Sequence, residues 1–277
     1  MDEKGFLIGV LQRLQRVYSK EAFNRGLLSA ADQDGNREWI TYIASICMNG
    51  SWIPPTLIYQ AQPRTVMDSW VEELDEAKHK VHFASSPTGW TNDDLGYEWL
   101  TTVFDRYTKQ KAQQGRDYRM LILNGHGSHV NMQFLNWCHE HILVAVFLPH
   151  STHHLQPLDV SLFGPLSQHY TQELDAWQFK SQAKRSLSKR EFLSLFWPVF
   201  KKAFSVANIA SGWAHVSLKP FDPNRIISTI NSIKIKDQSR PTTSGTSSSV
   251  LSVIDSKVVR RLAQEVLDRF RKQRLKN

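Results

Sequence analysis

The chain has 277 residues, of which 41% are hydrophobic, and a formal net charge of +8, which together describe a globular protein with a polyanionic partner, nucleic acid before membrane. Its two cysteines are too few for a disulfide framework, and its longest apolar run, residues 142 to 149, is far below the roughly 20 residues that cross a bilayer. Because its start also lacks a signal-peptide pattern, the sequence predicts a soluble intracellular protein without membrane association.

Strands are predicted in the first third of the chain. EWITYIASICM (38 to 48) and WIPPTLIYQ (52 to 60) are rich in β-branched and aromatic residues, and the Asn49-Gly50 pair between them is typical of a hairpin turn. GFLIGVL near the start and VHFAS (81 to 85) are further strand candidates. The spacing of the apolar residues then changes to that of a helix in TNDDLGYEWLTTVFDRYTKQ (91 to 110). This helix is predicted to begin with a capping box of Thr91 and Asp94.

Helices and strands alternate in the next part of the chain. MLIL (120 to 123) predicts a short apolar strand, and VNMQFLNWCHEH (130 to 141) predicts a helix. ILVAVFLP (142 to 149) has no polar alternation, which is typical of a strand buried on both faces. A further helix begins near Leu158.

A second capping box, Ser188 with Glu191, predicts the start of a helix over FLSLFWPVFKKAF. We expect Pro198 to kink or interrupt this helix, because proline lacks the N–H that the helix interior needs. The Trp and Phe residues between 192 and 213 are interpreted as core side chains.

Three segments make up the predicted domain organisation. Residues 1–235 form an α/β domain, 236–250 form a Ser/Thr-rich linker, and 251–277 form a basic amphipathic helix. The last helix has a single apolar stripe, through which the chain could form a homo-oligomer.

The strand and helix order predicts a mixed sheet flanked by helices on both faces. In such a sheet, polar groups at the ends of the central strands converge on one point. Three residues have this position in the predicted fold: Asp2 on the first strand, Asn124 directly after MLIL, and Asp159 at the start of the helix that follows ILVAVFLP.

Six segments of the sequence resemble, in the right order, the DDE superfamily endonuclease domain of pogo-like transposases, the group that includes the jerky and centromere-protein-B relatives. They are MDEKGF, GNREWITYIAS, GWTNDDLGYEWL, LILNGHGSH, FLPHSTHHLQPLDVSLFGPL and LKPFDPNRI. The resemblance covers residues 2 to about 230. It implies an RNase H-like fold, DNA as partner, a nuclear location, and cutting and joining of DNA that depends on Mg²⁺ or Mn²⁺.

The resemblance also implies the site. Asp2 and Asp159 match the first and third acidic positions of the family, whereas Asn124 stands at the second, where the family has Asp. Three carboxylates suit this chemistry because two hard cations, roughly 4 Å apart, activate the nucleophile and stabilise the leaving oxygen. The neutral amide of Asn124 lacks the negative charge that Asp would bring, so we expect weak metal binding and impaired cleavage. Only Met1 precedes Asp2, whereas family members have an apolar lead-in, so the first strand is interpreted as truncated.

Histidines surround two of these positions. The resemblance places His126, His129 and His153 in loops beside the metal centre, where imidazoles would contact phosphate or orient carboxylates. Two other interpretations stay open: a zinc site that adds His150 and His154, and a simple tight turn at Asn124-Gly125.

Three functions remain compatible with the sequence. The first is an active endonuclease that tolerates Asn124, and the second is a non-enzymatic module that binds DNA or protein after loss of the chemistry. The third is a decayed transposon relic. We expect the transposase-derived domain with impaired cleavage.

Overall fold

A computed structural model describes residues 1–8, 38–124, 131–141, 143–147, 155–181, 187–225 and 227–228. The chain forms two compact units, Met1–Thr229 and Ile230–Asn277, and all described residues belong to the first. The predicted linker (236–250), the predicted C-terminal helix (251–277) and its proposed oligomer contact therefore lie outside the described residues. The same holds for His126, His129, His150, His153 and His154.

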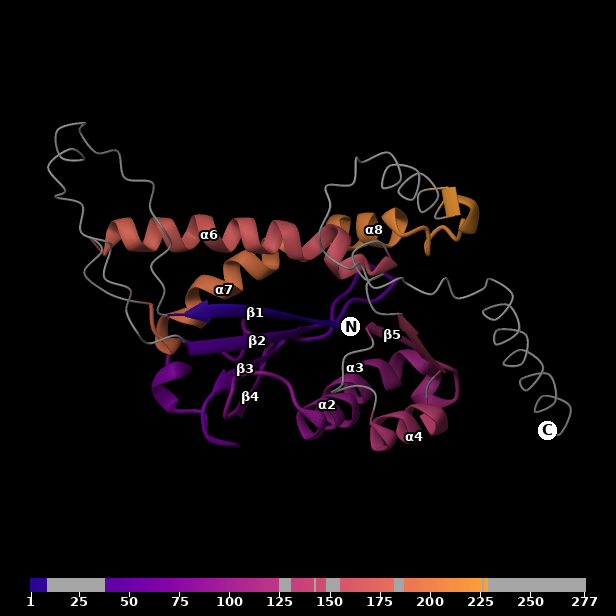
Figure 1. The fold of residues 1–277 in the computed structure, drawn as a ribbon, viewed down its shortest axis with the longest axis horizontal. Coiled ribbons are helices and arrows are strands. Elements are labelled where there is room, and N and C mark those ends of the chain that lie inside the picture. Colours follow the sequence, from indigo (N-terminus) through magenta and orange to yellow (C-terminus); the bar gives the residue numbers. More distant parts are fainter. Residues whose placement is uncertain are drawn as a thin grey trace, which may run out of the picture. The chain divides into compact units, whose positions relative to one another are not determined.

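The described strands form a four-stranded and a two-stranded sheet (Figure 1). The first has the order β1-β2-β3-β4, with bounds Asp2–Ile8, Glu38–Ala44, Thr56–Gln60 and His82–Ser86. Its β1–β2 and β2–β3 pairs are antiparallel, and β4 adds to β3 in parallel. In the second sheet β5 (Met120–Asn124) pairs in parallel with β6 (Leu143–Phe147). The predicted mixed, RNase H-like α/β fold is therefore confirmed.

The predicted hairpin joins β2 to β3. Beyond Ala44 the two arms continue to pair, since Cys47 N donates to Ser51 O at 2.8 Å. The chain reverses at Gly50, whose φ of 87° lies in the left-handed region that glycine adopts without strain. This turn matches the Asn-Gly prediction.

Helical segments follow the strands in chain order. They are η1 (Asp68–Trp70), α2 (Asp93–Glu98), η2 (Trp99–Phe104), α3 (Asp105–Lys109), η3 (Gln110–Gly115), α4 (Met132–His141), η5 (Leu158–Leu162), α6 (Phe163–Lys180), α7 (Lys189–Ala203) and α8 (Val206–His215). The predicted helix over 91–110 corresponds to the consecutive segments α2, η2 and α3. Its predicted cap is wrong: Asn92 Oδ1 accepts from Leu95 N at 2.9 Å, because extended Asn92 precedes the first turn while Thr91 is buried.

The start of α7 is as predicted, whereas the interruption that Pro198 could cause is absent, and the kink that it could cause instead stays a prediction. Ser188 and Glu191 form the capping box, with both reciprocal hydrogen bonds present. However, α7 runs through Pro198 without interruption. A proline removes only one backbone hydrogen bond, and this helix buries aromatic side chains before and after it, which keep both halves against the sheet.

An aromatic layer fills the space between α7 and the sheet. Phe192, Phe196, Phe200 and Phe204 recur every four residues, so they lie on one face of α7, and all are buried. Their successive ring centroids are 5.5, 5.7 and 4.8 Å apart. Tyr42 of β2 contacts three of these rings edge-on. The prediction of core side chains in this region is thus confirmed.

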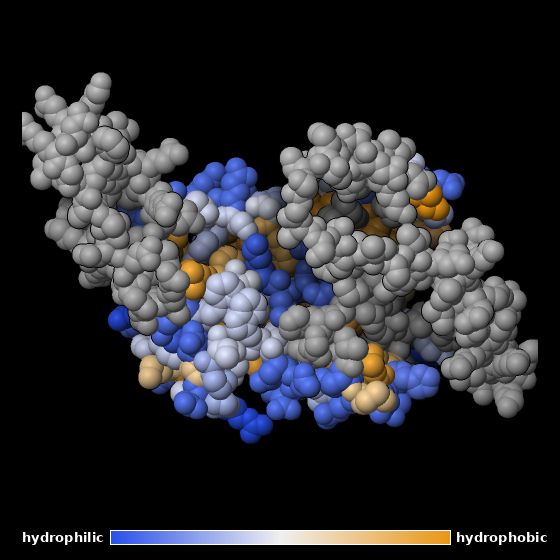
Figure 2. All heavy atoms as spheres, in the orientation of Figure 1, coloured by the Kyte–Doolittle hydropathy of each residue, from blue (hydrophilic) through white to orange (hydrophobic). Residues whose placement is uncertain are grey.

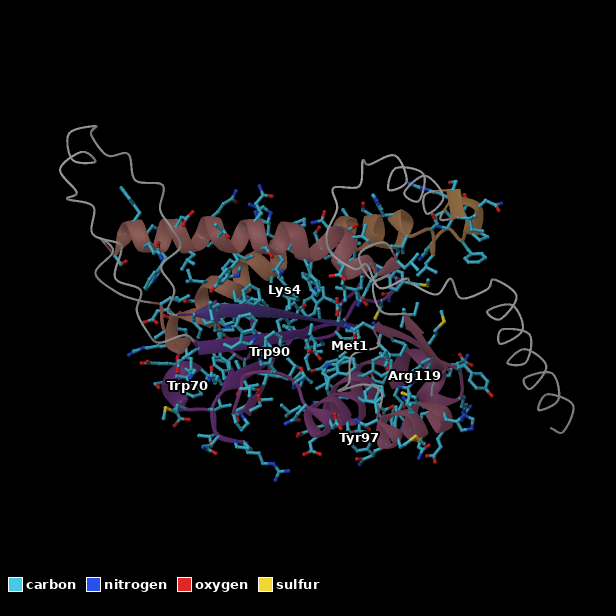
Figure 3. The ribbon with its side chains drawn as sticks, in the orientation of Figure 1. Met1, Lys4, Trp70, Trp90, Tyr97 and Arg119 are labelled. Carbon is cyan, nitrogen blue, oxygen red and sulfur yellow. The ribbon has the colours of Figure 1, made fainter. Side chains whose placement is uncertain are left out.

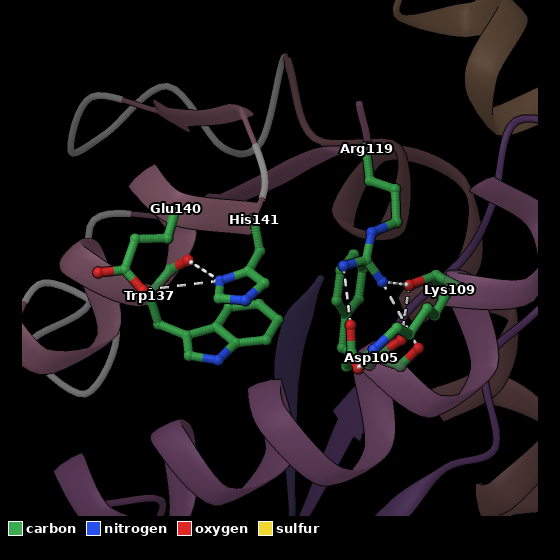
Figure 4. A network of polar contacts seen from close by, with 8 residues as sticks. Asp105, Lys109, Arg119, Trp137, Glu140 and His141 are labelled. Carbon is green, nitrogen blue, oxygen red and sulfur yellow. Dashed lines mark hydrogen bonds and ion pairs between the residues drawn. The ribbon is translucent and has the colours of Figure 1, made fainter. Parts of the chain in front are cut away.

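Helices α6 and α7 cover one face of the four-stranded sheet, and α2, η2 and α4 contribute to a second core on the other (Figure 1). Arg119, just before β5, connects this strand to α3 (Figure 4). Its guanidinium bonds Asp105 Oδ1 at 2.8 Å and Thr108 Oγ1 at 2.9 Å. The side chains of Arg119 and Asp105 are 8% and 19% exposed, so α3 is held to the start of β5 by an ion pair that is buried on its arginine side.

The visible face of the described residues is largely hydrophilic, with separate orange patches (Figure 2). The large exposed apolar side chains come from different elements, such as Phe179 of α6 and Met132 of α4. Scattered exposure of this kind is ordinary for a protein surface and needs no partner to explain it.

Candidate functional site

The site begins where β1 and β5 meet. Met1 precedes β1, and its terminal amine donates to Ile122 O of β5 at 2.8 Å. Two residues further along β5, Asn124 Nδ2 donates to Asp2 Oδ1 at 2.9 Å. These two bonds bring the start of β1 beside β5, so they connect the two sheets at the point where both predicted polar residues stand.

Asp2 is the most perturbed acid of this junction. Its side chain is buried, and burial is the main reason why its pKa is raised from 3.8 to about 7. The negative charge of Asp159 is the second cause, while a hydrogen bond from the Glu3 backbone acts in the opposite direction. The carboxylate of Asp159 is therefore near enough to Asp2 to interact with it electrostatically.

Asp159 reaches the junction from a different part of the chain. It lies in the first turn of η5, which begins directly after Pro157. The unpaired N–H groups at a helix start favour a carboxylate there. The structure thus brings Asp2, Asn124 and Asp159 from β1, β5 and η5 to one place.

Gln156 is a site residue that the sequence analysis did not single out. Its Nε2 donates to Met1 O at 3.0 Å, and its side chain is almost fully buried. Its Oε1 has no hydrogen-bond partner within the described part of the chain. The only sequence signal is its place three residues before Asp159 in the same segment, so Gln156 supports the backbone of β1 beside the acidic pair.

The donor set fits a hard divalent cation, though incompletely. Among the described residues, no three His, Cys, Asp or Glu side chains gather as metal ligands. Asp2 and the half-buried Asp159 nevertheless offer two carboxylates, and a cation would offset the burial of Asp2 and the repulsion between the two. Asn124 adds a neutral amide in place of a third charge. That these residues ligate a metal stays a prediction, and the predicted histidine contacts lie outside the described residues.

None of the helices in the described part of the chain combines the length and apolarity that crossing a membrane requires. This finding concerns helices only, and it is consistent with the mixed composition of α6, the longest described helix.

Comparison with known proteins gives two findings. The family model of the DDE superfamily endonuclease matches residues 36–219, which is more than half of the chain. The protein named "MFS-type transporter clz9" of Cochliobolus lunatus is 34% identical over 231 residues, which cover 83% of this chain. Those residues cover 24% of that relative, so the chain spans about a quarter of its length. No solved structure is significantly similar to the chain.

Proposed function

Because the chain belongs to the DDE superfamily of endonucleases, we propose that it is a DNA-binding domain of the pogo-like transposase group whose strand cleavage is impaired at Asn124. The proposal rests on one observation: Asn124 Nδ2 donates to Asp2 Oδ1 at 2.9 Å, beside a carboxylate, Asp159, that raises the pKa of Asp2. Members of this superfamily typically use divalent metals, and DNA is the substrate that such a domain implies.

The contact explains the impairment in two ways. Asn124 brings no negative charge, and at short range in a partly desolvated site a missing charge weakens the hold on a cation by on the order of several kcal/mol. In addition, its amide N–H group donates to the Asp2 oxygen that a cation would otherwise use. The hydrogen bond from Asn124 therefore stabilises the Asp2 carboxylate without a metal, so that less free energy is gained when a metal binds.

Asp2, Asp159 and the amide oxygen of Asn124 would hold Mg²⁺ or Mn²⁺, weakly. The bound ion would supply Lewis-acid polarisation of phosphate and water. The residues of the chain have separate tasks: Asn124 orients Asp2, Gln156 holds the backbone of Met1, and the start of η5 positions Asp159.

DNA binding is proposed from the family and from the net charge of +8, which favours contacts with phosphate groups. With DNA as the partner, the proposed location is the nucleus. The alternative is a non-enzymatic module that binds DNA or protein. The same Asn124 contact favours it, since it satisfies the buried Asp2 without any cation.

The test is Asn124→Asp in the full chain. We expect Mg²⁺ or Mn²⁺ affinity, measured by titration calorimetry, to rise at least about tenfold, because the substitution returns a charged ligand to the junction. Nicking of supercoiled DNA in the same buffer measures whether cleavage follows. Binding of a DNA duplex is measured separately in buffer without divalent ions, so that DNA binding is distinguished from DNA cleavage.

Two control variants sharpen the result. Asp159→Asn in the repaired chain should abolish the gain, whereas Asp117→Asn, an exposed acid outside the junction, should preserve it. If Asn124→Asp binds no more metal than the parent chain, the three residues do not form one metal site. Efficient nicking by the parent chain would contradict the impairment.

A further inference from the structure

Two stacked tryptophans lie on the four-stranded sheet. Trp90 follows β4 in the turn before α2, and its indole stacks on that of Trp39 in β2, with ring centroids 4.6 Å apart and planes inclined by 26°. Trp90 is 47% exposed, so the contact with Trp39 covers one face of its ring and leaves the other open to solvent. Figure 3 shows Trp90 at the four-stranded sheet, well separated from Arg119 beside the second sheet.

The lower ring of the stack, that of Trp39, is held flat on the sheet. Leu7 of β1 lies opposite Trp39, and Gly5 stands two residues before Leu7. A Cβ on Gly5 would collide with the Trp39 ring, so the glycine makes room for the indole to lie across β1. Gln60 Oε1 of β3 accepts from Trp39 N at 3.0 Å, which fixes the backbone beneath the ring.

The turn that carries the upper ring is equally fixed. Gly89 N donates to Ser86 O at 3.1 Å, and Ser86 Oγ donates to Trp90 O at 2.7 Å. Trp90 N donates to Thr88 Oγ1 at 3.3 Å. Gly89 has a φ of 74°, and a Cβ there would collide with the backbone oxygen of Trp39, so the turn lies directly against β2. The open ring face of Trp90 is therefore in place before any ligand arrives.

Unpaired negative charges stand close to this ring. Asp93 and Asp94, in the first turn of α2, are both exposed, and neither forms an ion pair with another described residue. Asp93 follows Trp90 by three residues, so their Cα atoms are at most about 11 Å apart. Glu38 of β2, in contrast, is already paired with Lys189, whose Nζ lies 2.7 Å from its Oε1.

These features favour a cationic ligand. The face of an indole is the negative part of its quadrupole, and tryptophan is the best aromatic partner for a cation. Residues 86–94 contain no Lys or Arg. The net charge of +8 belongs to the whole chain, and at about 0.15 M salt the screening length is about 8 Å, so the nearby carboxylates outweigh distant charges.

An arginine side chain matches both the ring and the carboxylates. Its planar guanidinium stacks on aromatic faces, is more weakly hydrated than an ammonium group, and pairs with carboxylates. We propose that the open face of Trp90 binds an arginine side chain in a basic peptide segment of a partner protein, whose neighbouring cations pair with Asp93 and Asp94. A fixed ring loses little conformational freedom when such a ligand binds.

The arginine site is separate from the junction. Trp39 lies opposite Leu7, which is five residues after Asp2, so the stack is roughly 17 Å from Asp2 along β1 at about 3.3 Å per residue. Neither Asn124 nor DNA takes part in it, so its failure in a test would leave the proposed function unaffected.

The test measures binding of fluorescein-labelled hexa-arginine to the full chain by fluorescence anisotropy in about 0.15 M salt, with hexa-lysine for comparison. Trp90→Leu keeps an apolar cover on Trp39 but removes the ring, whereas Trp90→Phe keeps a ring. The double variant Asp93→Asn/Asp94→Asn removes both carboxylates. Its matched control is Asp117→Asn/Glu173→Gln, which removes two exposed carboxylates from other parts of the surface and gives the same net charge.

Hexa-arginine should bind more tightly than hexa-lysine, and Trp90→Leu should weaken its binding about two- to fivefold, with Trp90→Phe in between. The double variant at Asp93 and Asp94 should weaken it by about two- to fivefold, and the matched control should change it little. Unchanged binding in Trp90→Leu, or an equal loss in both double variants, would overturn the arginine site. The same conclusion would follow if a six-residue oligothymidylate, and not hexa-arginine, lost affinity in Trp90→Leu, because the ring would then bind an unpaired base.

Discussion

The aromatic layer under α7 and the junction between β1 and β5 are both buried, but they bury different groups. The layer stacks four phenylalanines whose rings bring no polar atoms into the core. The junction buries the carboxylate of Asp2 and the amide of Gln156, whose Oε1 has no partner within the described residues. Apolar burial stabilises a fold, whereas a buried charge costs free energy. The difference teaches that the layer supplies stability, whereas the junction carries a carboxyl group whose pKa burial raises.

The largest expected effect is at the layer. Phe196→Ala removes a ring that contacts Phe6 and Tyr42, with centroids at 5.8 and 5.2 Å. Because the site is closed on all sides, we expect the free energy of unfolding to fall by about 3–5 kcal/mol. Urea unfolding followed by tryptophan fluorescence measures it. Phe179→Ala, at a ring that is 89% exposed, should stay within about 0.5 kcal/mol of the parent, and a similar loss in both variants would refute the contrast.

A smaller loss of stability is expected at Arg119, a buried charge that forms an ion pair with Asp105. Arg119→Met keeps much of the side-chain volume but leaves the Asp105 carboxylate with only its longer ion pair, to Lys109 Nζ at 3.8 Å. We expect a loss of about 2–3 kcal/mol, reduced from the fully buried case because Asp105 is partly exposed. In the double variant with Asp105→Asn, thermal unfolding should show less than the sum of the two single losses. Strict additivity would mean that the pair is not coupled.

The smallest effect concerns Asp2 and depends on pH. With its pKa raised from 3.8 to about 7, folded Asp2 holds a proton that the unfolded chain has released, so stability falls as pH rises through this window. Burial lowers the pKa of the Met1 amine to about 6, which opposes the trend above that pH, so the slope is read between about pH 4 and pH 6.

Asp2→Asn removes this titration. In buffer without divalent ions, the variant should lose the extra slope and become more stable than the parent at pH 5 by about 1–2 kcal/mol. Denaturant unfolding at several pH values measures the difference. Asp117→Asn should keep the slope of the parent. An identical slope in the parent and in Asp2→Asn would show that Asp2 is not perturbed by the junction.

Local pattern was sufficient for most elements. The alternation and the Asn49-Gly50 pair predicted the β2–β3 hairpin, and Ser188 with Glu191 predicted the start of α7, because each depends on neighbours in the chain. The predicted interruption at Pro198 is absent because the penalty of a proline is local, while the packing of the rings around it is not. The other predicted effect of this proline, a kink, stays a prediction. The helix cap is Asn92 and not the predicted Thr91, because Thr91 is buried, and burial depends on the tertiary structure.

For the site, the resemblance to the family selected Asp2, Asn124 and Asp159 from the sequence, and the metal role of these residues stays a prediction. Gln156 could not be found in that way, because a buried amide is recognised only when its surroundings are known.

The sequence by itself determined the α/β class, the hairpin, the helix over α7 and the neutral residue at position 124, because periodicity, turn chemistry and residue identity are properties of the chain. Only the tertiary structure decided that Asn124 donates to Asp2, that burial and the charge of Asp159 raise the pKa of Asp2, and that the amine of Met1 donates to Ile122 O. These features arise between residues more than 30 positions apart, where desolvation and charge act through space and leave no periodic trace in the sequence.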